Sequence, residues 1–304
     1  MGDEAVTTIG ELAGLKHLST GKVRELYAVD DDSILFVATD RISAFDVVML
    51  NGIPGKGKIL TQLSVFWFTK LFNDQKFGRN HLITANVDEM PEKVQKHAKI
   101  LRGRSMLVKK VNVIMLEAIV RGYITGSGWK DYKRSGSVCS IPLPDGLKHC
   151  QQLPKVLFTP STKAEMGQHD ENISAAEAEE KVGKALYDSI EARSLQLYSA
   201  ASEFAKQKNI IIADTKFEFG TDKNGELYLI DEVLTPDSSR FWDVDKYAVG
   251  RNQDSYDKQY VRDYLESIKF DKKTAVAIPD DVVRNTMKKY VEIYKILTGE
   301  EPKL

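Results

Sequence analysis

Residues 210–243 read IIIADTKFEFGTDKNGELYLIDEVLTPDSSRFWD, and this stretch decides how the most charged part of the chain should fold. Two β-rich runs flank Asn224-Gly225, the preferred two-residue loop of a type I′ hairpin. That loop pairs Glu218 directly with Asp231. The sequence therefore predicts a β-hairpin over residues 210–231 with two carboxylates facing each other.

Two carboxylates opposite each other destabilise a sheet unless another charge compensates. Mg²⁺ would do so, because one or two carboxylates plus water and phosphate oxygens describe a nucleotide-bound magnesium site. The pattern thus predicts Glu218 and Asp231 as metal ligands. On this argument Glu218→Gln or Asp231→Asn should cut turnover and raise the stability of the metal-free protein. The alternative is a solvated strand face with Glu218 exposed.

Alternation along the first strand places Asp214, Lys216 and Glu218 on one face. Charge of such regularity indicates a face that borders either water or a site. The polar turn LTPDSSRFW then brings an acid, two hydroxyl groups and Arg240 to the end of the second strand. Arg240 is suited to clamp a carboxylate or phosphate, although Asp237-Ser238 equally fits an ordinary turn and cap pair.

The first third of the chain is rich in strands. Runs at 23–29 and 34–39 flank a polar turn and predict another β-hairpin. Residues 60–72 have apolar side chains at helical spacing, which predicts a helix against that sheet. Residues 105–120 contain two more β-rich runs.

The remainder is mixed. Residues 139–172 are rich in proline and polar groups and predict a loop. Ser174 and Glu177 form a capping box at the start of a helical pattern that Gly183 interrupts, and residues 279–299 predict a last helix. This order of elements predicts an α+β protein with a smaller N-terminal and a larger C-terminal lobe.

Composition argues against several classes of protein. Lys and Arg number 43 against 44 Asp and Glu, and a net charge of -1 does not suit a non-specific nucleic-acid binder. Cys139 and Cys150 match neither a disulfide framework nor a zinc pattern. No run approaches the ~18 apolar residues of a membrane span, and the acidic N-terminus does not resemble a signal peptide. We expect a cytoplasmic protein without membrane contact, and nothing in the sequence indicates an obligate protein partner.

Gly21 and Lys22 are a weak candidate for phosphate binding. They are not part of a Walker A motif, because its first glycine and the hydroxyl residue after the lysine are missing. They fit better in a β-hairpin lid, where backbone N–H groups and one ammonium meet phosphate, as in protein kinases.

Two other segments are candidate sites. Arg121 precedes three glycines in seven residues, and Ser127 follows the second of them. Guanidinium, hydroxyl and backbone N–H groups suit an anionic ligand, but a tight turn with a surface arginine explains the pattern as well. Lys163 and Asp170 lie in the long polar stretch TPSTKAEMGQHDEN. Such loops often carry function, yet Asp170 also fits a simple approach to the next helix.

Together these segments resemble one family, the SAICAR synthetases (phosphoribosylaminoimidazole-succinocarboxamide synthases) of purine biosynthesis. The matching stretches follow in order from about residue 20 to about residue 265: GKVRELY, ATDRISAFD, LEAIVRGYITGSGW, FTPSTKAEMGQHDENIS, IIIADTKFEFG, IDEVLTPDSSRFW and QDSYDKQYVRDYL. Each stretch alone is weakly specific, whereas all of them in order are highly specific. The chain looks like the longer single-function form found in fungi.

The resemblance implies a fold of two α+β lobes with ATP in the cleft between them, distantly similar to protein kinases. Residues 1–114 would form the N-terminal lobe with the β-hairpin nucleotide lid, and residues 115–304 the C-terminal lobe with the substrate and metal site. The implied reaction joins L-aspartate to the carboxylate of carboxyaminoimidazole ribonucleotide (CAIR). It consumes ATP and gives SAICAR, ADP and phosphate, through an acyl phosphate.

The resemblance also implies residue roles. Gly21 and Lys22 would meet ATP, and Asp214 and Lys216 would be the catalytic pair, at the imidazole and carboxylate of CAIR. It implies Mg²⁺ at the two facing carboxylates. The other implied substrate contacts are Arg121, Ser127 and Arg240 for the ribose phosphate and polar groups of CAIR, Asp170 for a ribose or second metal, Arg262 for the phosphate, Ser43 and Asp46 for aspartate, and Lys163.

Two other functions fit part of the pattern. A small-molecule kinase with a similar fold would share the ATP and Mg²⁺ residues but need no aspartate. A non-catalytic nucleotide-binding protein is the second alternative. Lys22, Lys216, Glu218 and Asp231 together argue against it, because a regulatory relative has no need of metal ligands.

Overall fold

The computed structural model describes residues 4–163 and 171–304 and arranges them around two main β-sheets. The smaller sheet is antiparallel, in the order β1-β2-β3-β8-β7. Its strands are β1 (Lys16–Thr20), β2 (Arg24–Ala28), β3 (Ser33–Ala38), β8 (Ser105–Lys109) and β7 (Leu82–Thr84). The pairing of β2 with β3 confirms the predicted N-terminal hairpin.

The larger sheet is built around its longest strand, β15 (Ile210–Thr221). Its main order is β13-β10-β15-β16-β6, and three short strands pair beside this path. The other strands are β6 (Arg79–Asn80), β9 (Asn112–Val113), β10 (Leu116–Tyr123), β13 (Gln152–Phe158), β14 (Ser161–Thr162), β16 (Leu227–Ile230) and β17 (Ser239–Asp243). The mixture of sheets and helices confirms the α+β prediction.

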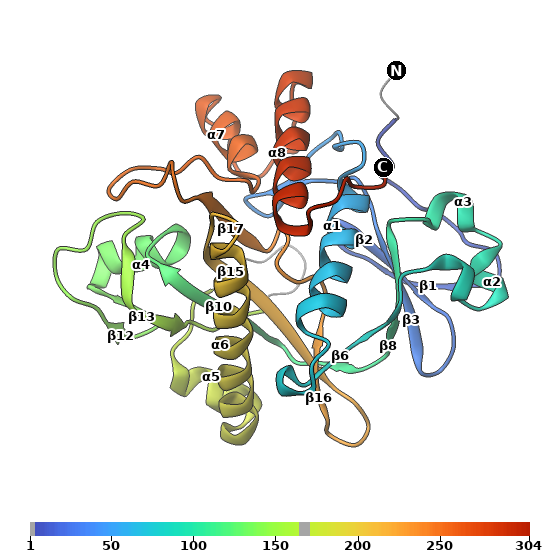
Figure 1. Cartoon of the computed structure of the whole chain (residues 1–304), viewed down its shortest axis with the longest axis horizontal. Coiled ribbons are helices and arrows are strands. Elements are labelled where there is room, and N and C mark those ends of the chain that lie inside the picture. Colours follow the sequence, from blue (N-terminus) through green and yellow to red (C-terminus); the bar gives the residue numbers. More distant parts are fainter. Residues whose placement is uncertain (1–3, 164–170) are drawn as a thin grey trace.

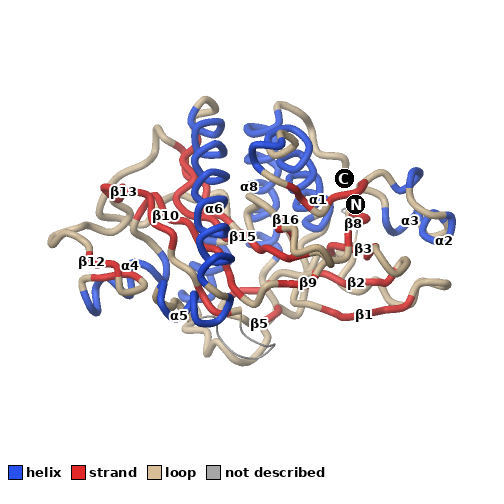
Figure 2. Tube along the Cα trace, turned by 90° about the horizontal axis from the view of Figure 1, so that it is seen from below, coloured by secondary structure: helices blue, strands red, loops and turns tan. Residues whose placement is uncertain are grey.

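Three helices organise the space between and beside the sheets. α6 (Lys184–Lys206) packs against β10 and β15, and Figure 1 shows it crossing that face of the larger sheet. α1 (Lys56–Phe66) continues as a π-helix, Trp67–Leu71, and packs against β3 and against the C-terminal helix α8 (Asp280–Thr298). In both Figure 1 and the turned view of Figure 2, α1 and α8 lie between α6 and the strands of the smaller sheet.

Shorter elements complete the fold. The structure has α2 (Glu92–Gln95), α3 (Ala98–Leu101), α4 (Gly126–Ser135), α5 (Ala175–Val182), α7 (Gln259–Ser267), 3₁₀ turns at Gln75–Phe77 and Val87–Glu89, and two small strand pairs, β4 (Ser43–Ala44) with β5 (Val47–Val48) and β11 (Ser137–Val138) with β12 (Ile141–Pro142). Across the two described ranges, no helix combines the length and apolarity that a membrane crossing requires. The cytoplasmic location stays a prediction.

Several helix signals are confirmed. Ser174 and Glu177 form both hydrogen bonds of the capping box, and Gly183 separates α5 from α6. Gly299 ends α8 in the left-handed conformation, with φ of 75°. The predicted helix over residues 60–72 begins earlier, at Lys56.

One hydrophobic cluster spans both sheets. It includes Ile59 and Trp67 of the α1 segment, Val108 of β8, Phe217 of β15 and Tyr290 of α8. β6 and β9 precede residue 114 but pair with the larger sheet. The predicted lobes 1–114 and 115–304 therefore share a core, and the boundary between them stays a prediction.

The hairpin of residues 210–230 forms, but its predicted register is wrong by one residue. Its loop is Lys223, Asn224 and Gly225, one residue longer than predicted, and Gly225 takes φ of 81°. Glu218 pairs with Ile230 instead of Asp231. The reason lies in Asp222, whose carboxylate accepts the amides of Asn224 (2.9 Å) and Glu226 (3.1 Å) and so stabilises the longer loop.

The prediction of a loop over residues 139–172 is also wrong, and the tight turn offered as the alternative for the glycine-rich segment does not form. β10 runs on to Tyr123 and α4 begins at Gly126, so the glycine-rich segment is a strand end joined to a helix start. Gly128 lies inside that helix, where an added Cβ would come within 3.1 Å of the Arg121 side chain. Residues 139–172 contain β13 and β14, since pairing with β10 overrides their polar composition.

Candidate active site

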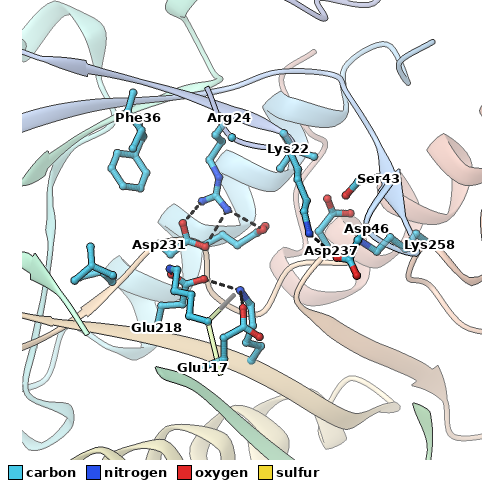
Figure 3. A pocket seen from close by; sticks show the side chains of 18 of the residues that line it. Lys22, Arg24, Phe36, Ser43, Asp46, Glu117, Glu218, Asp231, Asp237 and Lys258 are labelled. Atoms are coloured by element: carbon cyan, nitrogen blue, oxygen red, sulfur yellow. Dashed lines mark hydrogen bonds and ion pairs between the residues drawn. The ribbon is translucent and has the colours of Figure 1, made fainter. Parts of the chain in front are cut away.

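A cleft of about 800 Å³ is lined by β2 and β3 on one side and by β10, β15 and β16 on the other. Figure 3 shows acidic and basic side chains from both sides converging on it. Ten predicted site residues line it: Gly21, Lys22, Ser43, Asp46, Ser127, Lys163, Lys216, Glu218, Asp231 and Arg262. Asp170 lies outside the described residues.

The Glu218 carboxylate lies between two ammonium groups. Lys216 Nζ is 2.6 Å from one oxygen, and Lys163 Nζ contacts the other. Lys216 also donates to Glu117 at 2.9 Å. Burial alone would raise the pKa of Glu218, but the two lysines outweigh it and hold this pKa below its ordinary value. Burial likewise opposes the charge of Lys216, but Glu218 and Glu117 raise its pKa well above the ordinary value.

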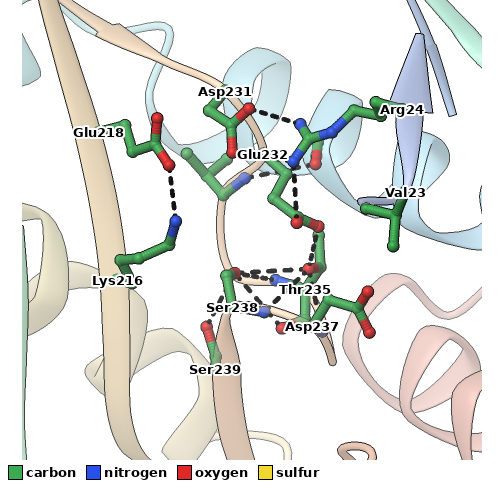
Figure 4. A network of polar contacts seen from close by, with 12 residues as sticks. Val23, Arg24, Lys216, Glu218, Asp231, Glu232, Thr235, Asp237, Ser238 and Ser239 are labelled. Carbon is green, nitrogen blue, oxygen red and sulfur yellow. Dashed lines mark hydrogen bonds and ion pairs between the residues drawn. The ribbon is translucent and has the colours of Figure 1, made fainter. Parts of the chain in front are cut away.

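Asp231 is held by an arginine that the sequence did not indicate. Arg24 Nη1 and Nη2 lie 2.7 and 2.9 Å from the two carboxylate oxygens of Asp231, and Nη2 is 3.1 Å from Glu232 (Figure 4). Burial opposes the charge of Arg24, yet Asp231 and Glu232 raise its pKa above the ordinary value. Arg24 follows the Gly-Lys pair as an ordinary strand residue, so no local pattern marks it.

The donor chemistry at this place fits a hard divalent cation. Glu218 and Asp231 both line the cleft and offer only oxygen atoms, as Mg²⁺ prefers. Within the described ranges, no group of three acidic, histidine or cysteine side chains could hold a metal by itself. Two carboxylates would therefore need water and nucleotide phosphate as the remaining ligands, the arrangement that the sequence predicted.

The Gly21-Lys22 turn joins β1 to β2, as predicted for a hairpin lid. Arg41 braces it: its guanidinium donates to the carbonyl groups of Gly21 (3.0 Å), Lys22 (3.1 Å) and Arg24 (3.3 Å). Lys22 Nζ is 2.5 Å from Asp46. In the sequence Arg41 is visible only as part of the matching stretch ATDRISAFD, because its contact with the turn spans up to twenty positions of the chain.

A second cavity, of about 330 Å³, shares Ser127 and Arg262 with the cleft and is also lined by Arg240 and the first residue of α4. Arg240 Nη1 is 2.5 Å from Asp214, and Asp214 and Asp257 raise the pKa of Arg240 against the effect of burial. The cavity therefore combines two guanidinium groups with a helix N-terminus, a setting for an anion.

Arg121 and Asp214 lie behind the walls of these cavities. Arg121 donates to Thr159 (2.9 Å), to Asp214 (3.3 Å) and to Ser127 (2.9 Å), and it is 2% exposed. Burial lowers the pKa of its guanidinium. Arg121 donates to Ser127, and Asp214 accepts a hydrogen bond from Arg240. The two buried residues therefore fix the positions of these two cavity residues.

The far end of the cleft is apolar. Leu26 and Phe36 of the smaller sheet, Val113 of β9 and Ile230 of β16 line it. An apolar slot formed by these side chains, beside a centre lined by cations and carboxylates, fits a nucleotide, with its base in the slot and its phosphates toward the charges.

Known proteins resemble this chain over most of its length. The SAICAR synthetase family matches residues 17–278. A phosphoribosylaminoimidazole-succinocarboxamide synthase from Desulfatibacillum aliphaticivorans is 54% identical over 95% of this chain and 96% of its own length. A SAICAR synthase from Saccharomyces cerevisiae in complex with SAICAR has a TM-score of 0.87 and 50% identity, covering 97% of this chain and 99% of that one. A type-2 SAICAR synthetase in complex with ADP has a TM-score of 0.68 and 28% identity, covering 94% and 99%.

The fold and the site define an α+β enzyme of the ligase class, with a charged cleft between two sheets. More narrowly, the chain belongs to the SAICAR synthetase family of purine biosynthesis.

Proposed function

We propose that this protein uses ATP to join L-aspartate to the carboxylate of CAIR, giving SAICAR, ADP and phosphate in the cytoplasm. The observation that carries the proposal is the cleft itself. It brings the Gly21-Lys22 turn together with Glu218 and Asp231 from the opposite sheet. The SAICAR and ADP complexes of its structural relatives support the same two ligand classes.

In this proposal the nucleotide base occupies the slot of Leu26, Phe36 and Val113, and its phosphates extend toward Lys22. Glu218 and Asp231 would hold Mg²⁺, which would neutralise charge on the transferred phosphoryl group. A phosphate group entering here would offer new anionic partners to Lys163, Lys216 and Arg24, which now pair with those two carboxylates.

CAIR would span the two connected cavities. Its ribose phosphate fits the smaller one, at Arg240, Arg262 and Ser127, and its imidazole and carboxylate would reach Lys216. Arg121 and Asp214 would hold Ser127 and Arg240 in the geometry for binding. Lys163, on the other side of Glu218, remains a candidate substrate contact.

The chemistry requires activation because a carboxylate is a poor acceptor for an amine. A CAIR carboxylate oxygen attacks the γ-phosphorus, and the bond to ADP breaks, which leaves an acyl phosphate. The aspartate amine then attacks the carbonyl carbon, loses a proton and expels phosphate. The protein would contribute mainly positioning and charge neutralisation.

A direct assay tests the proposal. Purified protein with ATP, Mg²⁺, CAIR and L-aspartate should release ADP and SAICAR in equal amounts, and omission of any one component should abolish both products. Release of ADP without aspartate, together with a stable phosphorylated product, would indicate the kinase alternative. No ADP release in the complete mixture would refute catalysis.

A further inference from the structure

The chain passes from one main sheet to the other at His81. β6 ends just before this residue and pairs with β16 of the larger sheet, whereas β7 begins just after it and pairs with β8 of the smaller sheet. The His81 backbone bonds to both sheets: its N–H donates to Leu229 at 3.0 Å, and its carbonyl accepts from Lys109 at 2.7 Å. His81 therefore lies at a junction between the two walls of the cleft.

The imidazole ring of His81 is buried between two aromatic side chains. It is 2% exposed and packs edge-on against Phe36 of β3, with ring centroids 5.4 Å apart and ring planes at 89°. Phe68, in the π-helical turn after α1, contacts the ring with a centroid distance of 5.5 Å. Phe36 itself lines the proposed base slot. The ring of His81 thus supports a wall of that slot.

Packing alone does not explain why this ring is polar. Its buried Nε2 has no hydrogen-bond partner in the ranges 4–163 and 171–304, and an apolar ring would avoid that cost. Burial lowers the pKa of His81 to about 4, while the charge of Asp231 and a hydrogen bond to the Asp231 backbone act to raise it. The ring is therefore neutral at pH 7, and its other nitrogen, Nδ1, makes the bond to Asp231.

The backbone of Asp231 benefits from such a bond. Its φ is 65°, an uncommon conformation for a residue other than glycine. Asp231 directly follows β16 and lines the cleft as a proposed ligand of Mg²⁺. Figure 3 shows Phe36 and Asp231 lining the cleft from its two sides. His81 thus contacts both the base slot and the turn that carries a metal ligand.

We propose that His81 is a positioning residue of the nucleotide site, which holds the base slot and Asp231 at a fixed separation; this inference rests on the proposed use of ATP and Mg²⁺. A bound nucleotide must reach both places at once, with its base beside Phe36 and its phosphates at the metal. A shift of either place would weaken one of these contacts. The two contributions can be separated, because the edge contact needs an aromatic ring and the bond to Asp231 needs an N–H group.

Two substitutions separate them, with ADP as the probe in isothermal titration calorimetry. His81→Phe keeps the ring and loses the N–H. ADP binding without Mg²⁺ should stay unchanged, while the gain in affinity on addition of Mg²⁺ should fall about 10-fold. His81→Asn keeps an N–H near the position of Nδ1 and loses the ring. It should weaken ADP binding about 10-fold, equally with and without Mg²⁺.

Steady-state kinetics gives a second readout. Both variants should raise the KM for ATP and leave the KM values for CAIR and L-aspartate unchanged, whereas a general loss of structure would raise all three. His97→Phe is the matched control, because His97 also bonds to a backbone carbonyl, that of Ala13 at 3.0 Å, but lies outside the cleft. It should change neither ADP binding nor any KM.

The opposite outcomes overturn the proposal. Unchanged ADP affinities in both variants would show that His81 does not position the site, and an identical pattern in both would show that ring and N–H have no separate roles. If only one variant folds, as thermal unfolding would show, that variant decides by its own expected pattern. If neither folds, His81 is a core residue only. An unsubstituted protein that binds no ADP would instead refute the proposed use of ATP.

Discussion

Glu218 and Asp231 each have their own cations in this fold, and this changes what their removal should do. From the sequence alone they form a pair that only Mg²⁺ relieves, so that loss of either charge would stabilise the metal-free protein. Lys216 and Lys163 hold Glu218, whereas Arg24 holds Asp231. Substitution of either carboxylate would therefore leave cations without partners.

We now expect Glu218→Gln and Asp231→Asn each to lower the free energy of unfolding, by about 1–3 kcal/mol. Turnover should fall about 100-fold or more, because the metal ligands are lost. Urea unfolding without Mg²⁺ and steady-state ADP release measure the two effects. Glu226→Gln, an exposed carboxylate in the same hairpin, is the control and should change neither. A gain in stability in both variants would restore the original like-charge argument.

At the scale of elements, the β1–β2 turn owes its shape to a residue from another segment. Arg41 donates to three carbonyl groups of the turn, so those carbonyls point toward Arg41. It also donates to Thr7 (2.6 Å) and Glu25 (3.1 Å). A guanidinium offers five N–H donors in a fixed planar fork, whereas a lysine offers three from a single nitrogen and so cannot reach acceptors spread this widely.

Arg41→Lys should therefore loosen the lid and raise the KM for ATP about 10-fold, with a smaller effect on the KM for L-aspartate. Steady-state kinetics with each substrate varied in turn measures both. Arg102→Lys is a matched control, because Arg102 also forms a forked pair, with Asp88, but on an exposed surface. An unchanged KM for ATP in Arg41→Lys would show that the turn keeps its shape without the brace.

The start of α4 depends on the absence of a side chain. Gly126 has φ of 56°, and an added Cβ would lie 2.6 Å from Arg240 Nη2. Gly136, at the other end of α4, has φ of 67°, but its added Cβ would meet nothing within 4 Å. The two positions thus share backbone strain and differ in contact with the proposed phosphate site.

Gly126→Ala and Gly136→Ala should each lower the free energy of unfolding by about 1 kcal/mol, because alanine disfavours positive φ. Gly126→Ala alone should raise the KM for CAIR, by about 10-fold, since Arg240 must move. Thermal unfolding and CAIR-dependent kinetics test this pair of variants. Equal KM values in the two would argue against Arg240 as a CAIR ligand.

At the scale of the whole molecule, the shared hydrophobic cluster opposes independent lobes. Trp67 is fully buried in it and donates its Nε1 hydrogen to the carbonyl of Leu234 at 3.0 Å. This bond ties the end of α1 to the loop that follows β16. A continuous core of this kind favours one cooperative unfolding transition over two.

The three tryptophans test that cooperativity. Trp67→Phe leaves only Trp129 and Trp242 as fluorescent reporters, both in the predicted C-terminal lobe, whereas Trp129→Phe/Trp242→Phe leaves only Trp67. In each variant the urea midpoint from fluorescence should equal the midpoint from circular dichroism at 222 nm. Separate midpoints would support two lobes that unfold independently, with a boundary near residue 114.

The sequence by itself determined the fold class, the family, the longest strands and helices, and ten residues that line the candidate site. These depend on local signals: strand alternation, the Ser174 capping box, glycine at helix ends and the ordered motifs. Tertiary structure decided which charges meet. Asp222 reset the register of the central hairpin, and Arg24 reached Asp231 across 207 positions of sequence. Ion pairing depends on distance in space, which a local pattern does not encode.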